Sequence, residues 1–175
     1  MRNLCIDTAF TCNFGHGDKS SGGFTVAELV IIIAVLGVLG SISYSGLNST
    51  LPSSRDSNRD LDTSTIADKL ELYYETTPVA GGSTYPATSV GVSGLATIVD
   101  SQDSTVAPGQ EANSLILATS NATQSPTTSQ YIYQPITRAG GLCTNATTAL
   151  CARYVLYYRQ EVTGNVNVIN SLRQQ

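Results

Sequence analysis

The stretch "SSGGFTVAELVIIIAVLGVLGSISYSGL" at residues 20–47 decides the fold expected for this chain. Residues 29–47 carry no charge, and the run is rich in Leu, Ile and Val. An α-helix rises ~1.5 Å per residue, so about 20 residues span the ~30 Å hydrocarbon core of a bilayer. The sequence therefore predicts one helix long enough to cross a membrane.

Glu28 is the only acidic or basic residue in this run. A charged side chain at the centre of a membrane helix costs ~2.5–3.5 kcal/mol on insertion scales, so such a residue indicates a function by default. A second explanation is local, because Glu28 lies near the expected helix start. There the helix dipole favours a negative charge by ~0.3–1 kcal/mol.

An ordinary secretory signal is an alternative explanation of the apolar run. Such a signal has a basic leader, a short apolar segment and a small-residue cleavage site after it. Residues 1–23 hold two bases and two acids, so the leader is net neutral, but "GSIS" at residues 40–43 offers small residues for cleavage. Both explanations stay open on these observations.

Composition limits the classes of function. A chain of 175 residues with 41% hydrophobic and 13% charged residues has room for one domain and an anchor. Its 13 acidic residues outnumber its 9 basic ones. A nucleic-acid surface requires clustered Lys and Arg, so no direct contact with nucleic acid is expected.

The residues around Glu28 resemble the signature of type IV prepilins. Gly23 is followed by "FTVAELVIIIAVLG", which provides an aromatic first residue, Glu as the fifth residue and an apolar helix. The resemblance implies that a prepilin peptidase cuts between Gly23 and Phe24 and that Phe24 is then N-methylated. It also implies that Glu28 pairs with the terminal ammonium of a neighbouring subunit, which would offset the cost of holding each charge in an apolar core.

The same resemblance implies a domain organisation and a set of partners. Residues 1–23 would be a leader peptide, 24–51 a transmembrane and filament-core helix, and 52–175 an extracytoplasmic globular domain. The partners would be other copies of the chain, the prepilin peptidase, the pilus assembly platform and the membrane. The protein would cross the inner membrane once before assembly and lie in an extracellular filament afterwards.

A second helical stretch is predicted at residues 55–78. Ile66, Leu70 and Tyr73 or Tyr74 recur at helical spacing and form one apolar stripe among polar residues. Pro52 precedes it and sits either in the first turn of a second helix or inside one long helix that runs from residue 24 to 76.

The rest of the sequence is interpreted as β-structure and loops. Three or four antiparallel strands are expected from the stretches 90–99, 113–119, 130–137, 153–162 and 165–170. A turn at residues 163–165 predicts a C-terminal hairpin. One face of this small sheet should cover the stripe of the second helical stretch. The predicted fold class is α+β, a long helix packed by its second half against an antiparallel sheet, as in pilins.

The four cysteines form two pairs along the sequence. Cys5 and Cys12 lie in the leader, whereas Cys143 and Cys151 lie near the C-terminus. In an exported domain a disulfide between the second pair is the default expectation, and it resembles the C-terminal disulfide loop of many pilins. Two buried free thiols are the alternative.

Catalytic and metal-binding patterns are weak in this sequence. The only histidine, His16, lies in the leader, so a histidine-based triad is not available after it and a zinc site is not expected. Asp100 and Asp103 offer two calcium ligands, but they lack an EF-hand pattern. We therefore expect no enzyme activity, no metal and no cofactor.

The expected function is that of a structural subunit in a type IV pilus-like filament for adhesion, motility or DNA uptake. The alternatives are a pseudopilin of a type II secretion system and a monomeric, membrane-anchored surface domain. Major pseudopilins usually carry a C-terminal calcium loop and lack a disulfide, so the cysteine pair favours the pilin interpretation.

Overall fold

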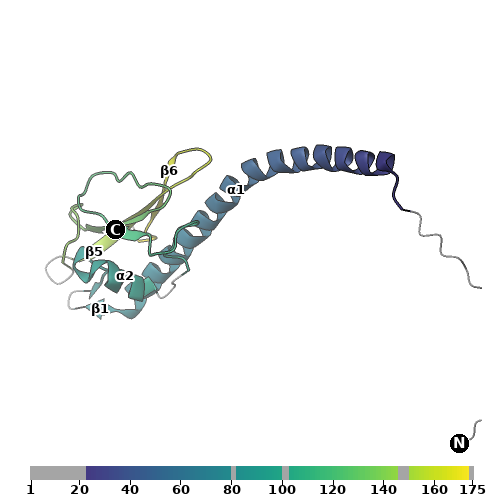
Figure 1. Ribbon diagram of the computed structural model, residues 1–175. Coiled ribbons are helices and arrows are strands. Elements are labelled where there is room, and N and C mark those ends of the chain that lie inside the picture. The colour runs from purple at the N-terminus through teal and green to yellow at the C-terminus, as the bar shows by residue number, and fades with distance from the viewer. Residues whose placement is uncertain (1–22, 80–81, 100–102, 146–149, 174–175) are drawn as a thin grey trace, which may run out of the picture. The chain divides into compact units, whose positions relative to one another are not determined.

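The computed structural model describes residues 23–79, 82–99, 103–145 and 150–173, with backbone only at 45–49 (Figure 1). Its elements are α1 (Val26–Thr76), β1 (Pro78–Val79), β2 (Gly82–Ser83), the 3-10 helix η1 (Thr88–Val90), α2 (Gly91–Val99), β3 (Leu115–Leu117), β4 (Tyr131–Thr137), β5 (Cys151–Arg159) and β6 (Val166–Asn170). The chain divides into two compact units, Met1–Ser43 and Tyr44–Gln175, and α1 belongs to both.

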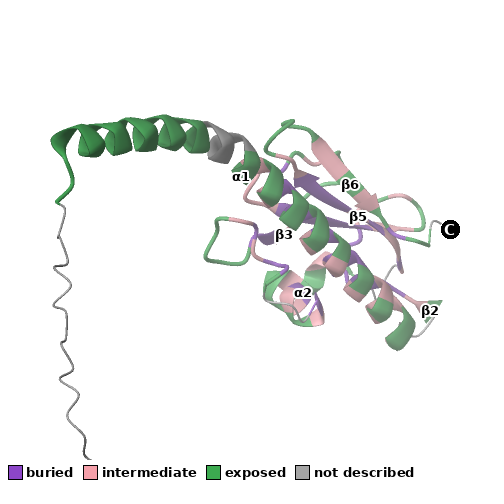
Figure 2. Cartoon of the chain, turned by 90° about the vertical axis from the view of Figure 1, so that its right-hand side faces the viewer, coloured by how far each residue is buried: buried purple, intermediate pink, exposed green. Residues whose placement is uncertain are grey.

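α1 is a single helix of 51 residues with Pro52 inside it. The two predicted helical stretches are therefore one element, and the proline removes one backbone donor without ending it. The predicted stripe is confirmed, because Ile66 and Leu70 are fully buried and Tyr74 is partly buried against the same core. Figure 2 shows buried and half-buried residues of α1 only in the part of the helix that belongs to the second unit.

The sheet that covers this stripe has four strands in the order β3-β4-β5-β6. β4, β5 and β6 pair antiparallel, but β3 pairs parallel with β4, so the expectation of a purely antiparallel sheet is wrong at this edge. A parallel pair requires a long crossover, which residues 118–130 provide. The Nε2 of Gln134 holds this crossover against the sheet by donating to the carbonyls of Ser120 and Ala122, at 2.8 and 2.9 Å.

The core between α1 and the sheet is built largely from tyrosines. Four of them are at most 1% exposed: Tyr85, Tyr131, Tyr133 and Tyr154. Their hydroxyls are not left without partners, which would be costly. Tyr131 donates to the carboxylate of Asp62 in α1 at 2.7 Å, and Tyr133 donates to the carbonyl of Pro86 at 2.8 Å. The tyrosines therefore join the layers of the second unit through polar as well as apolar contacts.

The stretch 90–99, expected as part of the β-structure, is helical. It forms the end of η1 and all of α2, in which Leu95 and Val99 are buried four residues apart. Ser93 and Thr97 lie on another face, where the Thr97 hydroxyl donates to the Ser93 carbonyl at 2.9 Å. A short apolar run does not distinguish a strand from a buried helix by periodicity, and here packing onto the core decides.

The C-terminal hairpin is confirmed. β5 and β6 are adjacent and antiparallel, with Val155 opposite Asn170 and Arg159 opposite Val166. The turn between them contains Gly164 at φ 69°, a conformation that glycine adopts without strain. The second unit is thus an α+β fold in which the long helix packs against a four-stranded mixed sheet.

Candidate functional site

The start of α1 brings together three residues predicted to act in processing and assembly, Gly23, Phe24 and Glu28. Thr25 caps this helix, since its Oγ1 accepts a hydrogen bond from the backbone N–H of Glu28 at 3.2 Å. The Thr25 carbonyl accepts another from the N–H of Leu29 at 3.1 Å. Sequence reasoning missed Thr25, although the Thr-x-x-Glu spacing is the known signature of a capping box.

The bond between Gly23 and Phe24 is accessible. Gly23 is exposed, and Phe24 is 77% exposed. A Cβ added to Gly23 would meet no atom within 4 Å, and its φ is not positive. Neither space nor backbone conformation in the described part of the chain requires glycine at this position.

The helix that follows is apolar on every side. Val26–Tyr44 is 19 residues long with a mean hydropathy of 2.4, and none of it is buried within the described structure. Its large apolar side chains range from 43% exposed at Ile32 to 80% exposed at Val26. A helix that is hydrophobic all round is normally buried in a membrane or in a larger core. By length and composition this segment suits a membrane anchor or a signal sequence.

Glu28 lies in the first turn of this apolar helix and is exposed. The helix dipole favours its charge there. Its backbone N–H is bound by Thr25, but its carboxylate has no hydrogen-bond or ion-pair partner among the described residues. The carboxylate is therefore available to a group outside that part of the chain.

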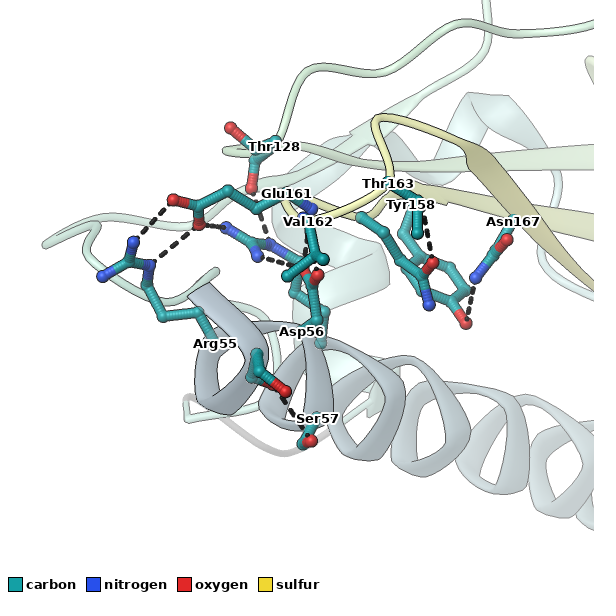
Figure 3. A network of polar contacts seen from close by, with 12 residues as sticks. Arg55, Asp56, Ser57, Thr128, Tyr158, Glu161, Val162, Thr163 and Asn167 are labelled. Atoms are coloured by element: carbon teal, nitrogen blue, oxygen red, sulfur yellow. Dashed lines mark hydrogen bonds and ion pairs between the residues drawn. The ribbon is translucent and has the colours of Figure 1, made fainter. Parts of the chain in front are cut away.

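A second polar site ties α1 to the β5–β6 turn (Figure 3). The carboxylate of Asp56 accepts from the backbone N–H groups of Glu161 at 2.7 Å and Val162 at 2.9 Å. It also accepts from Arg59 Nη1 at 2.7 Å, and Arg59 Nε donates to the Thr128 carbonyl at 3.0 Å. Asp56 and Arg59 are 7% and 2% exposed, so this is a buried and fully bonded ion pair.

The charges of this site stabilise one another. Burial alone would raise the pKa of Asp56, but the N–H donors of Glu161 and Val162 and the guanidinium of Arg59 outweigh it and hold that pKa below its ordinary value. The hydrogen bond from Arg55 lowers the pKa of Glu161 in the same way. The site is structural, because each charge is occupied within the chain. Sequence reasoning missed it, since Asp56 and its backbone partners are over 100 positions apart.

The predicted disulfide between Cys143 and Cys151 is present, with a Cα–Cα distance of 5.5 Å. Both cysteines are buried. Cys151 begins β5, while the N–H of Cys143 donates to the carbonyl of Pro135 in β4 and its carbonyl accepts from Thr88 in η1. The bridge therefore connects the sheet to the segment that leads into α2.

The remaining predictions concern metals and the leader. Among the described residues no group of three His, Cys, Asp or Glu side chains is placed to hold a metal. Cys5, Cys12, His16 and Asp100 lie outside the described residues.

No family model matches the chain, and neither a curated protein nor a solved structure does so significantly.

Proposed function

We propose that this protein is a structural subunit of a type IV pilus-like filament rather than an enzyme. Prepilin peptidase would cut between Gly23 and Phe24, and the new N-terminus would be N-methylated. The helix from residue 24 to 51 would first cross the inner membrane once. The assembly platform would then pack it against the same helix of other copies in an extracellular filament for adhesion, motility or DNA uptake.

The observation that carries this proposal is the carboxylate of Glu28. It is the only acid or base in Val26–Tyr44, it lies in the first helical turn, and no described residue binds it. A terminal ammonium at Phe24 of a neighbouring copy would supply the missing charge. Because each ion alone is costly in an apolar core, the pair also fixes the register between two helices.

The glycines of the apolar segment support the same proposal. A Cβ on Gly37 or Gly40 would meet no atom within 4 Å, so neither glycine is needed for packing in the described chain. Glycine costs about 1 kcal/mol relative to alanine inside a helix. Small residues allow helices to approach closely in an apolar environment, which gives these two positions a purpose in an assembly.

Two alternatives remain to be separated from this proposal. The Cys143–Cys151 disulfide favours a pilin over a type II secretion pseudopilin, whose major forms usually lack it. A monomeric membrane-anchored domain would leave the Glu28 carboxylate without a partner inside its anchor. Electron microscopy of surface filaments, with mass spectrometry of their subunit, distinguishes a filament from a monomer.

Processing gives the sharpest test. We expect the mature chain to begin at N-methylated Phe24, which N-terminal sequencing and peptide mass spectrometry of the native protein measure. A mature N-terminus at Ser41 or beyond would identify an ordinary signal peptide and exclude the filament core. Because the peptidase is proposed to cut after Gly23, a Gly23→Leu variant should accumulate uncut. The fold itself makes no demand on this position, so misfolding would not explain that result.

A further inference from the structure

A polar groove of about 340 Å³ lies on the outer face of the sheet, which is the face turned away from α1. Side chains of β4, β5, the end of β6 and the crossover at residues 118–130 line it, including Asn121, Thr123, Gln134, Arg153, Tyr157 and Asn170. Its size is within the range of small-molecule sites. None of these residues belongs to the start of α1, so the groove is independent of the proposed filament function.

The floor of the groove is held by internal hydrogen bonds. Gln134 is 2% exposed, and its Nε2 donates to the crossover carbonyls of Ser120 and Ala122. Its Oε1 accepts the hydroxyl of Tyr157 at 2.9 Å. Gln134 and Tyr157 thus have little capacity left for a ligand, and they fix the shape of the site.

Arg153 differs from Gln134 and Tyr157 because it has an unused hydrogen-bond donor. It is half-buried in β5, and its Nε is buried without a hydrogen-bond partner, the only such side-chain atom in the described part of the chain. No described residue lining the groove is acidic. Folding has therefore already removed part of the hydration of this cation, and no described residue that lines the groove provides a counter-charge, which a bound anion would supply.

The walls offer groups suited to hydroxyls. Asn121 Nδ2 donates to the carbonyl of Gly140 at 2.7 Å, which joins the crossover to the β4–β5 turn and leaves Asn121 Oδ1 as an acceptor. Asn170 and Thr123 add an amide and a hydroxyl to the lining. Amides and hydroxyls both donate and accept, as recognition of a polyhydroxylated molecule requires.

We infer that this groove binds a sugar acid, with its carboxylate on the guanidinium of Arg153 and its hydroxyls on Asn121 and Asn170. A guanidinium binds a carboxylate through two parallel N–H donors, which a single-point cation does not match. The ligand is either a free sugar acid or one residue of an acidic polysaccharide, and both present the same chemistry.

The test is a calorimetric titration of the full chain in detergent with glucuronate, glucose, inorganic phosphate and a short oligogalacturonate. We expect saturable binding of glucuronate, with glucose and phosphate at least about tenfold weaker, since a charged hydrogen-bonded pair typically contributes that much or more. Tighter binding of the oligomer than of glucuronate would identify the ligand as a polysaccharide. Equal binding of the two would identify it as a free sugar acid.

Arg153→Gln should weaken glucuronate binding about tenfold or more, while the matched control Arg138→Gln should not change it, since Arg138 is exposed and outside the groove. Asn170→Ala keeps the β5–β6 backbone pairing and should weaken the binding of glucuronate but not that of acetate. This variant tests the proposal if Arg153→Gln does not fold. The proposal is overturned if glucuronate shows no saturable binding, if glucose or phosphate binds equally well, or if the folded Arg153→Gln variant binds like the wild type.

Discussion

Asp56 in α1 accepts a hydrogen bond from the backbone N–H of Glu161 at 2.7 Å, although the two residues are 105 positions apart. The neighbouring N–H of Val162 binds the other carboxylate oxygen. One side chain of the helix therefore holds the turn between the last two strands. Because Arg59 Nη1 donates to the same carboxylate, removing Asp56 would leave this buried guanidinium with only its longer ion pair to Glu161, at 3.4 Å, and would leave two backbone donors without partners.

We expect Asp56→Ala to lower the free energy of unfolding of the second unit by roughly 3 kcal/mol, near the lower end of the typical cost of removing one partner of a buried ion pair, because Arg59 keeps its contact with Glu161. Thermal or urea denaturation of the full chain in detergent measures this loss. Asp68→Ala, at an exposed position of the same helix, is the control and should change stability by less than about 0.5 kcal/mol. Equal stability of the two variants would contradict the structural role of Asp56.

The lowered pKa of Asp56 also predicts a dependence on pH. A carboxyl whose pKa is lower in the folded than in the unfolded state stabilises the fold above the unfolded value, about 3.9 for Asp, and loses that contribution as pH falls through the folded value. Unfolding free energies should therefore fall below about pH 4. Asp62, whose pKa burial raises, acts in the opposite direction.

Comparing the wild type with Asp56→Asn isolates the contribution of Asp56 to the pH dependence of stability, since both proteins keep Asp62. We expect the gap in stability between wild type and variant to be widest near neutral pH and to close in acid. A gap that stays constant from pH 7 to pH 2 would show that titration of Asp56 has no part in it.

Variants at Glu28 and Thr25 distinguish two roles for the start of α1, charge pairing with a neighbouring subunit and capping of the helix. Glu28→Ala keeps the helix cap, because Thr25 Oγ1 binds the backbone N–H of residue 28 and not its side chain. If Glu28 binds the terminal ammonium of a neighbour, this variant leaves a charge without a partner, which typically costs ~3–5 kcal/mol, and it should be cleaved but not assembled. Membrane fractionation and electron microscopy measure both steps.

Thr25→Ala is the matched control. It removes the cap at a typical cost of ~1 kcal/mol of local helix stability and keeps the carboxylate, so we expect filaments to form. Normal filaments from Glu28→Ala, or loss of filaments from Thr25→Ala alone, would identify capping rather than charge pairing as the role of this helix start.

The Cys143–Cys151 bridge should stabilise the second unit. In the chain-entropy model a loop of 15 residues contributes ~3 kcal/mol, and this shorter loop should contribute somewhat less. Replacing both cysteines by alanine should lower the melting temperature accordingly, and reductant should lower that of the wild type but not of the variant. Two freely alkylated thiols in the native protein, found by intact-mass measurement, would exclude the bridge.

The residue pattern predicted the structure correctly where that structure depends on a single segment. The stripe of Ile66 and Leu70 follows the helical period, and its burial is confirmed. The turn around Gly164 between two β-rich stretches is confirmed as a hairpin. The pattern failed at residues 91–99, where Leu95 and Val99 suit a strand or a short buried helix equally, and at β3, whose direction is set by the course of the crossover.

By itself the sequence determined that the chain has an apolar helix with one carboxylate in its first turn, a half-buried second helical stretch, a C-terminal hairpin and a cysteine pair near its end. These follow from composition and periodicity within single segments. Only the tertiary structure decided that Asp56 holds Glu161 and Val162 and that Arg153 lies in a groove with no acidic residue among its described lining. Hydrogen bonds and burial depend on which distant segments meet, and no local pattern in the sequence specifies those meetings.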